Sequence, residues 1–142
     1  LDKKNVTALE QVKSTMVKYA DEGLSKLDTL ANFKNSTTLK TSCKRSLNFF
    51  KTEASKLSVY TDFLIKSEAF NKIKNNFESN LSAQSNKDEV DKYNKAVAEL
   101  NKSLALYNQT NPSLNQGRKD VYNDWNNSVK TFMDAYTPYA TK

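Results

Sequence analysis

Residues able to do acid–base or nucleophilic chemistry are sparse in this chain of 142 residues, which contains no histidine and one cysteine, Cys43. Without histidine, the usual general acid–base groups, nucleophile–histidine pairs and histidine metal ligands are missing. Only two glycines occur, and neither stands in a phosphate-binding pattern. We therefore predict a protein that is not an enzyme, with no catalytic residues, no cofactor and no metal site.

Neighbouring carboxylates form three groups along the chain: Asp21 with Glu22, Asp88 and Glu89 with Asp91, and Asp120 with Asp124. The second group falls in the expected first turn of a helix, where acidic side chains complement the helix dipole. Asp120 and Asp124 are four residues apart and would bind a cation only weakly. Ordinary surface charge is the better interpretation of all three groups.

The charge balance is basic, with 22 lysine and arginine residues against 16 acidic residues and a net charge of +6. The excess lies in the first third of the sequence, where Lys40, Lys44 and Arg45 are close together. Only two of the basic residues are arginine, and the lysines alternate with carboxylates, as on a solvated surface. We expect no nucleic acid as a partner, and a basic nucleic-acid-associated protein stays the alternative.

Apolar residues recur every three or four positions in four stretches, which predicts four helices. The ranges are 6–31, 39–81, 90–111 and 112–136, with the main turn at 82–87 and a helix stop at Asn111 and Pro112. The second stretch drifts to steps of four, which predicts a bend near residues 66–68. Cys43 shares an apolar stripe with Leu39, Leu47 and Phe50, so we expect its thiol to be buried.

These features predict an all-α fold in which residues 1–142 form a single domain. The expected architecture is an antiparallel up-down four-helix bundle with a long, bent second helix. Asn94, Asn101, Asn108 and Asn115 recur every seven residues beside the seam positions of the third stretch. Because heptad flanks are normally polar, we interpret these amides as the edge of a bundle seam rather than as a ligand site.

Aromatic and aliphatic side chains give the one positive indication of a binding surface. They lie in the second stretch and around the last proline, and the candidates are Phe63, Phe70, Ile73, Phe77, Tyr136 and Tyr139. Aromatic residues are enriched at recognition surfaces, but a wide buried helix face explains the same pattern. If the long second helix extends beyond its neighbours, its apolar end would instead pack on another copy, although a monomer is favoured.

The segment Tyr93-Asn94-x-Ala96-Val97, followed by Asn101, Asn108 and Pro112, resembles the late helical repeat of LemA-type bacterial proteins. The likeness covers about twenty residues. It implies a membrane-tethered, extracytoplasmic helical bundle without enzymatic activity. More broadly, the lysine- and asparagine-rich composition is similar to that of helical surface lipoproteins of bacteria.

Together these observations predict a non-enzymatic, extracytoplasmic binding or scaffold domain of a bacterial surface lipoprotein, in the periplasm or at the cell surface. The expected partner is a protein or another cell-envelope component. Because the sequence begins at Leu1, we expect contact with the membrane only through an anchor in a lost N-terminal segment. A helical oligomerisation or adhesion module is the remaining alternative.

Overall fold

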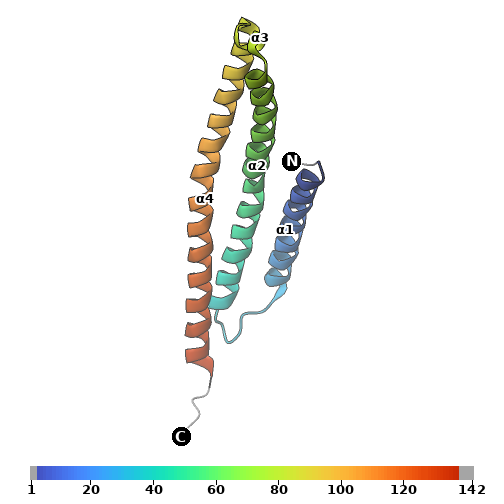
Figure 1. Cartoon of the computed structure of the whole chain (residues 1–142). Helices are drawn as coiled ribbons and strands as arrows, with labels where there is room; N and C mark the ends of the chain where they lie inside the picture. Colours follow the sequence, from blue (N-terminus) through green and yellow to red (C-terminus); the bar gives the residue numbers. More distant parts are fainter. Residues whose placement is uncertain (1–2, 138–142) are drawn as a thin grey trace. The chain divides into compact units, whose positions relative to one another are not determined.

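The computed structural model describes residues 3–137, and these residues are almost entirely helical (Figure 1). The helices are α1 (Lys3–Thr29), α2 (Thr38–Ser79), the single turn α3 (Leu81–Gln84) and α4 (Lys87–Tyr136). Within the described range no strand occurs, and one isolated bridge joins Phe33 to Ser36. The predicted all-α class and the long second helix are confirmed.

The third and fourth predicted helices are one helix, so the expected stop at Asn111 and Pro112 is wrong. α4 runs for 50 residues with Pro112 in its interior, although an interior proline costs about 3 kcal/mol relative to alanine. Side chains on both sides of the proline are buried, Thr110 at 8% exposure and Leu114 at 4%. Packing of these neighbours offsets the local cost of the proline.

Asparagine side chains cap the two helices that follow α2. Asn80 accepts a hydrogen bond from the Ser82 backbone N–H at 3.1 Å and starts α3. Asn86 accepts from the Asp88 N–H at 2.9 Å and starts α4, whose first turn holds Asp88 and Glu89. The predicted turn at 82–87 therefore exists, but α3 occupies its first half, and α2 continues to Ser79 without interruption.

The described contacts divide the chain into two units, and α1, α2 and α4 each contribute to both. Unit 1 comprises Leu1–Gln11 and Lys56–Pro112, and unit 2 comprises Val12–Ser55 and Ser113–Lys142. The single domain expected from the length of the chain stays a prediction. Each unit is described separately below.

In unit 1, α2 and α4 pack through rings in antiparallel order. Tyr107 contacts Phe63 and Tyr60 at centroid distances of 4.9 and 5.0 Å. Further toward the end of α2, Tyr93 contacts Phe77 at 4.6 Å and Phe70 at 5.7 Å. Because later residues of α2 meet earlier residues of α4, the two helices run in opposite directions here.

A polar layer between these rings fixes the same register in unit 1. The buried Ser103 hydroxyl donates to Asp62 at 2.6 Å, and Lys66 pairs with Asp62 at 3.1 Å. The hydrogen bond from Ser103 lowers the pKa of the Asp62 carboxyl, and Lys66 lowers it further. Lys66 also reaches Glu99 on α4 at 3.6 Å, so its charge stabilises the pairing of the two helices.

Unit 2 packs α1 and α4 against α2. Asp21 of α1 pairs with Lys51 at 2.6 Å, and Gly23 lies beside Leu47. From α4, Asp124 accepts a hydrogen bond from the buried Ser42 hydroxyl at 2.7 Å. Such a hydrogen bond from a buried hydroxyl to a carboxylate fixes the axial register of two helices.

The buried side chains of the described residues are mostly small, which lets the helices approach closely. They are Ala20, Ala54, Ala83, Leu114, Ser42, Thr61, Ser103 and Thr110. Large apolar side chains stay partly exposed, Tyr122 of unit 2 by 66%. A core of this kind leaves apolar surface open, and the candidate site is made from that surface.

Candidate functional site

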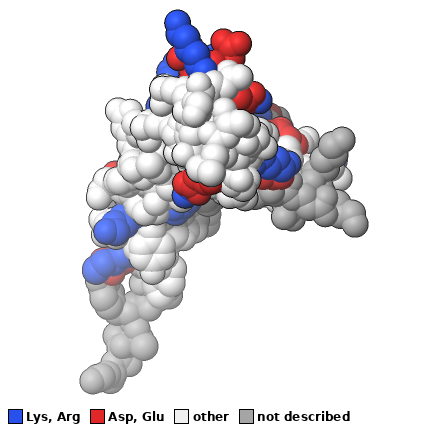
Figure 2. Space-filling view, turned by 45° about the horizontal axis from the view of Figure 1, so that its top comes forward, with Lys and Arg blue, Asp and Glu red and all other residues white. Residues whose placement is uncertain are grey.

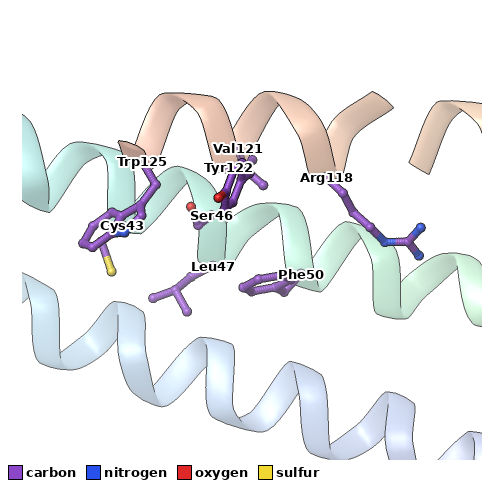
Figure 3. Close-up of a pocket in the computed structure, with 8 residues that line it drawn as sticks. All are labelled: Cys43, Ser46, Leu47, Phe50, Arg118, Val121, Tyr122 and Trp125. Atoms are coloured by element: carbon purple, nitrogen blue, oxygen red, sulfur yellow. The ribbon is translucent and has the colours of Figure 1, made fainter. Parts of the chain in front are cut away.

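An apolar groove lies on unit 2, and α2 forms its floor (Figure 3). Leu39, Cys43, Ser46 and Phe50 follow one another at steps of three or four on the same side of α2. A cavity of about 410 Å³ opens over Cys43, Ser46, Leu47 and Phe50. A second cavity of about 300 Å³ opens over Leu39, Lys40 and Cys43. We call these two cavities together the groove.

The walls of the groove come from the other two long helices. In Figure 3, Trp125 of α4 extends toward Cys43 of α2, while α1 runs on the other side of α2. Arg118, Val121 and Tyr122 continue the α4 wall of the first cavity. Leu27 and Leu30 form the α1 wall of the second cavity, which Phe132 of α4 and Phe33 of the connecting loop close. Cys43 and Trp125 line both cavities, so the groove is continuous.

The opposite side of α2 is polar. Thr41, Asn48, Thr52 and Ser55 lie there and are exposed. Asn48 donates to the Lys44 carbonyl at 3.0 Å, and Thr52 donates to the Asn48 carbonyl at 3.2 Å. Asn48 and Thr52 therefore bond to the backbone of their own helix.

Unit 2 is thus a layer of three helices with two unlike faces. The α2 positions that meet α1 are Lys44, Leu47 and Lys51, and those that meet α4 are Ser42, Arg45, Phe49 and Glu53. With α1 and α4 on opposite sides, α2 presents one polar and one apolar side between them. An apolar helix face normally packs against a second layer, and no element of the described part of unit 2 covers this one.

The groove continues along both walls as exposed apolar surface. On α1, Val12 and Tyr19 lie on the same helix face as Leu30, and on α4 Met133 follows Trp125 by eight residues. Eight large apolar side chains of unit 2 are exposed: Val12, Tyr19, Leu30, Phe33, Phe50, Tyr122, Trp125 and Met133. With about 200 Å² for a fully exposed large side chain, their exposed fractions amount to on the order of 800 Å². The five of them that line the cavities, Leu30, Phe33, Phe50, Tyr122 and Trp125, expose on the order of 500 Å². This area is comparable to the largest apolar patch of a typical monomer, about 300–600 Å², which is often functional.

A tight turn between α1 and α2 closes one end of the groove. Lys34 and Asn35 both have positive φ, at 45° and 63°, and the Ser36 N–H donates to the Phe33 carbonyl at 2.8 Å. Two consecutive positive φ angles define a type I′ turn. The turn places Phe33 against Phe132 and Tyr136 at centroid distances of 5.4 and 5.3 Å, and the Lys34 ammonium lies 5.5 Å from the Tyr136 ring centre.

The densest basic cluster of the sequence is largely neutralised in unit 2. Lys44 pairs with Asp28, and this hydrogen bond lowers the pKa of the Asp28 carboxyl. Arg45 pairs with Asp124, and Lys40 donates to the Leu30 carbonyl at 2.8 Å. On the face that Figure 2 shows, basic and acidic side chains are interspersed, with uncharged surface between them.

The predicted surface residues lie at several places. Phe63, Phe70 and Phe77 pack on α4 rings in unit 1, where Ile73 is also half-buried. Tyr136 lies in unit 2 within the aromatic cluster of Phe33 and Phe132, and Tyr139 lies outside the described residues. The structure brings Phe70 and Phe77 together over Tyr93, but it places Tyr136 in the other unit.

Sequence reasoning missed the groove itself. Cys43 was expected to be buried, but its side chain is only partly buried and lines both cavities. The stripe of Leu39, Cys43 and Phe50 was visible in the sequence, where it was interpreted as core. Trp125 and Tyr122 fall in the predicted helix at 112–136 but are not among the predicted surface residues. A tyrosine three residues before the single tryptophan was the available signal.

Asp124, one of the carboxylates that could have bound a cation, instead holds Ser42 and Arg45. Within residues 3–137, no group of three or more histidine, cysteine or acidic side chains is placed to hold a metal ion. None of the helices in that range is both long and apolar enough to span a bilayer. No protein-family model, curated protein or solved structure matches the chain, so the groove is interpreted from its own geometry.

Proposed function

We propose that this chain is a non-enzymatic helical binding module, and that the groove of unit 2 is its recognition surface for a protein partner. The observation that carries the proposal is the two-faced helical layer, because both of its faces are exposed and one of them is apolar. The exposed large apolar side chains of unit 2 sum to on the order of 800 Å², which is comparable to what one partner contributes to a standard protein interface, about 800 Å².

The groove favours a protein over a nucleic acid as the partner. Its lining is apolar and aromatic, and its two basic lining residues are engaged, Arg118 with Glu53 and Lys40 with the Leu30 carbonyl. Sites for nucleic acids instead place free basic groups in the groove itself, where they track phosphates. Lys44 and Arg45, the densest basic residues of the sequence, already pair with Asp28 and Asp124. This pairing leaves them less able to release counterions from a polyanion.

The proposed setting of the module is extracytoplasmic, in the periplasm or at the cell surface, with a lipid anchor supplied by a segment before Leu1. The resemblance to LemA-type proteins and to bacterial surface lipoproteins supports this setting. We also propose that the whole chain packs its three long helices in an up-down arrangement and stays monomeric in the absence of its partner. The antiparallel contacts within each unit support the packing.

Site-specific photo-crosslinking tests the proposal in cells that make the protein. A benzoylphenylalanine in place of Tyr122 samples the groove, and the same group in place of Asn48 samples the polar face of the same layer. We expect an adduct with one protein from Tyr122 and none from Asn48. The purified adduct protein should then bind the wild-type chain and the Asn48→Lys variant but not Tyr122→Lys.

Three results would contradict the proposal. Adducts of equal yield from both positions would show that the two faces do not differ in recognition. An adduct of twice the chain mass would make the groove a contact between copies. The groove would not be a protein-binding surface if position 122 gave no protein adduct in cells where the same method crosslinks a known complex.

A further inference from the structure

We infer that the segment that occupies the groove is an amphipathic α-helix whose apolar stripe is flanked by acidic residues. The inference rests on the proposed function and names the kind of partner. Shape indicates the helix, and the distribution of charge in unit 2 indicates the acidic flanks.

The shape of the groove suits one docked helix. Its floor is a single helix, α2, and its walls belong to α1 and α4, which lie on the two sides of that floor. The cavities of about 410 and 300 Å³ join at Cys43 and Trp125 and follow the direction of α2 from Leu39 to Phe50. A docked helix would add a fourth member to unit 2, which is how helical bundles close a shared core.

Unit 2 carries most of the net positive charge of the chain. Residues 12–55 and 113–137 hold eleven basic and seven acidic residues, an excess of four out of the +6 of the whole sequence. Six of the seven carboxylates already pair with a lysine or arginine: Asp21, Glu22, Asp28, Glu53, Asp124 and Asp134. We call Lys26, Lys34, Lys40 and Lys119 the excess cations. None of them forms an ion pair with a described carboxylate of the unit, although Lys40 acts on Asp28 at longer range.

The excess cations lie beside the groove. Lys40 lines it and donates to a carbonyl, and Lys34 follows the lining residue Phe33 in the turn. On α1, Lys26 directly precedes the lining residue Leu27 and lies one helical turn before Leu30. On α4, Lys119 directly follows the lining residue Arg118 and lies three residues before Tyr122. The charged residues that line the groove are both basic, Arg118 and Lys40. Acidic residues on the partner would complement this distribution.

Two other occupants fit these observations less well. A second copy would bring the same four lysines against each other, and like charges across an interface are costly. An anionic bilayer matches the charge, but amphipathic helices enter a bilayer with their apolar side chains protruding. Here the apolar residues line a hollow, which suits a convex occupant such as a helix.

Two synthetic peptides of about 18 residues, the length of α2 within unit 2, test the inference with the full chain. Both carry the same leucine stripe at helical spacing, and one has glutamate where the other has lysine on both flanks. Quenching or shift of Trp125 fluorescence reports occupancy of the groove, since Trp125 is the only tryptophan of the chain. Slower alkylation of Cys43, the only cysteine, is an independent reading of the same site.

We expect the glutamate peptide to bind at least about tenfold more tightly than the lysine peptide, because several ion pairs at the groove replace several like-charge contacts. Rising salt should reduce the difference. The double variant Lys26→Glu and Lys119→Glu should lose the preference. The matched control, Lys95→Glu and Lys102→Glu on the unit 1 part of α4, changes the net charge equally and should keep it.

The outcomes separate this inference from the proposed function. Equal binding of both peptides overturns the acidic partner and leaves the groove as a protein-binding surface. If neither peptide changes the Trp125 fluorescence or the rate of Cys43 alkylation, while the partner protein found by photo-crosslinking changes both, the helical occupant alone is overturned. Binding of the chain to anionic vesicles with protection of Cys43, in place of peptide binding, overturns both. Light scattering that shows a stable dimer with Cys43 protected also overturns both.

Discussion

Replacing Gly117 by alanine should destabilise the chain, although alanine is normally the better helix residue. A Cβ atom at this position of α4 would overlap the Phe49 ring of α2, with the Cζ and Cδ2 atoms at 3.0 and 3.1 Å and Cε2 closer still. The ring is rigid and belongs to another helix, so relief requires the helices to separate or the ring to rotate. Overpacking of this kind costs about 1–3 kcal/mol.

Against this cost stands a gain of about 1 kcal/mol from removing a glycine from a helix interior. We therefore expect Gly117→Ala to lower the free energy of unfolding by about 0–2 kcal/mol. Gly23→Ala is the matched control, because its Cβ would meet only Leu47, whose Cδ1 lies at 2.9 Å. A leucine tip moves at a cost of about 0.5–1.5 kcal/mol, so this variant should lie near the wild type.

Urea unfolding followed by far-UV circular dichroism measures both variants. Phe49→Leu removes ring atoms, so the double variant with Gly117→Ala should recover part of the loss, with a coupling energy of about 1 kcal/mol or more. The reasoning is refuted if Gly117→Ala is at least as stable as Gly23→Ala and shows no coupling to Phe49. The two helices would then not approach at this point.

Four further substitutions test other parts of the account. Leu114→Ala should cost about 2–5 kcal/mol in urea unfolding because Leu114 is 4% exposed, whereas Tyr122→Lys should stay within about 0.5 kcal/mol because Tyr122 is 66% exposed. Pro112→Ala should stabilise α4 by about 2 kcal/mol, the helix penalty of proline less its effect on the unfolded chain; a loss of stability would contradict a continuous α4. The hydrogen bond from Ser103 lowers the pKa of Asp62 in the folded chain. The stabilisation of the folded state by this bond is therefore present above the unfolded pKa of about 3.9, and it is lost as pH falls through the pKa of Asp62 in the folded chain. Ser103→Ala should therefore differ from the wild type at pH 7 and approach it at pH 3, and a difference independent of pH would contradict the coupling.

Local rules accounted for much of the secondary structure. The predicted range 6–31 lies close to α1 (Lys3–Thr29), and the polar stretch after residue 81 does hold the caps that start a new helix. The same rules wrongly predicted a helix stop at Pro112, because helix propensity includes only the local cost of a proline. The buried Thr110 and Leu114 on either side of it belong to contacts that a periodic pattern does not specify.

The groove could not be predicted from the sequence for a related reason. Leu39, Cys43 and Phe50 form an apolar row whether they face a core or an open surface, since the pattern is identical in both cases. Exposure depends on where α1 and α4 attach to α2, and this is fixed by distant pairs such as Ser42 with Asp124 and Asp21 with Lys51. Nothing in the spacing of those residues identifies them as partners.

The central claim is that the groove of unit 2 is open in the free, folded chain. Acrylamide quenching of Trp125 fluorescence tests it most directly, because this single tryptophan lines both cavities and is 39% exposed. At a concentration where light scattering gives a monomer, we predict red-shifted emission and quenching at a substantial fraction of the rate in urea. Blue-shifted emission that acrylamide does not quench in the folded monomer would show that the chain covers the groove itself, and would contradict the account.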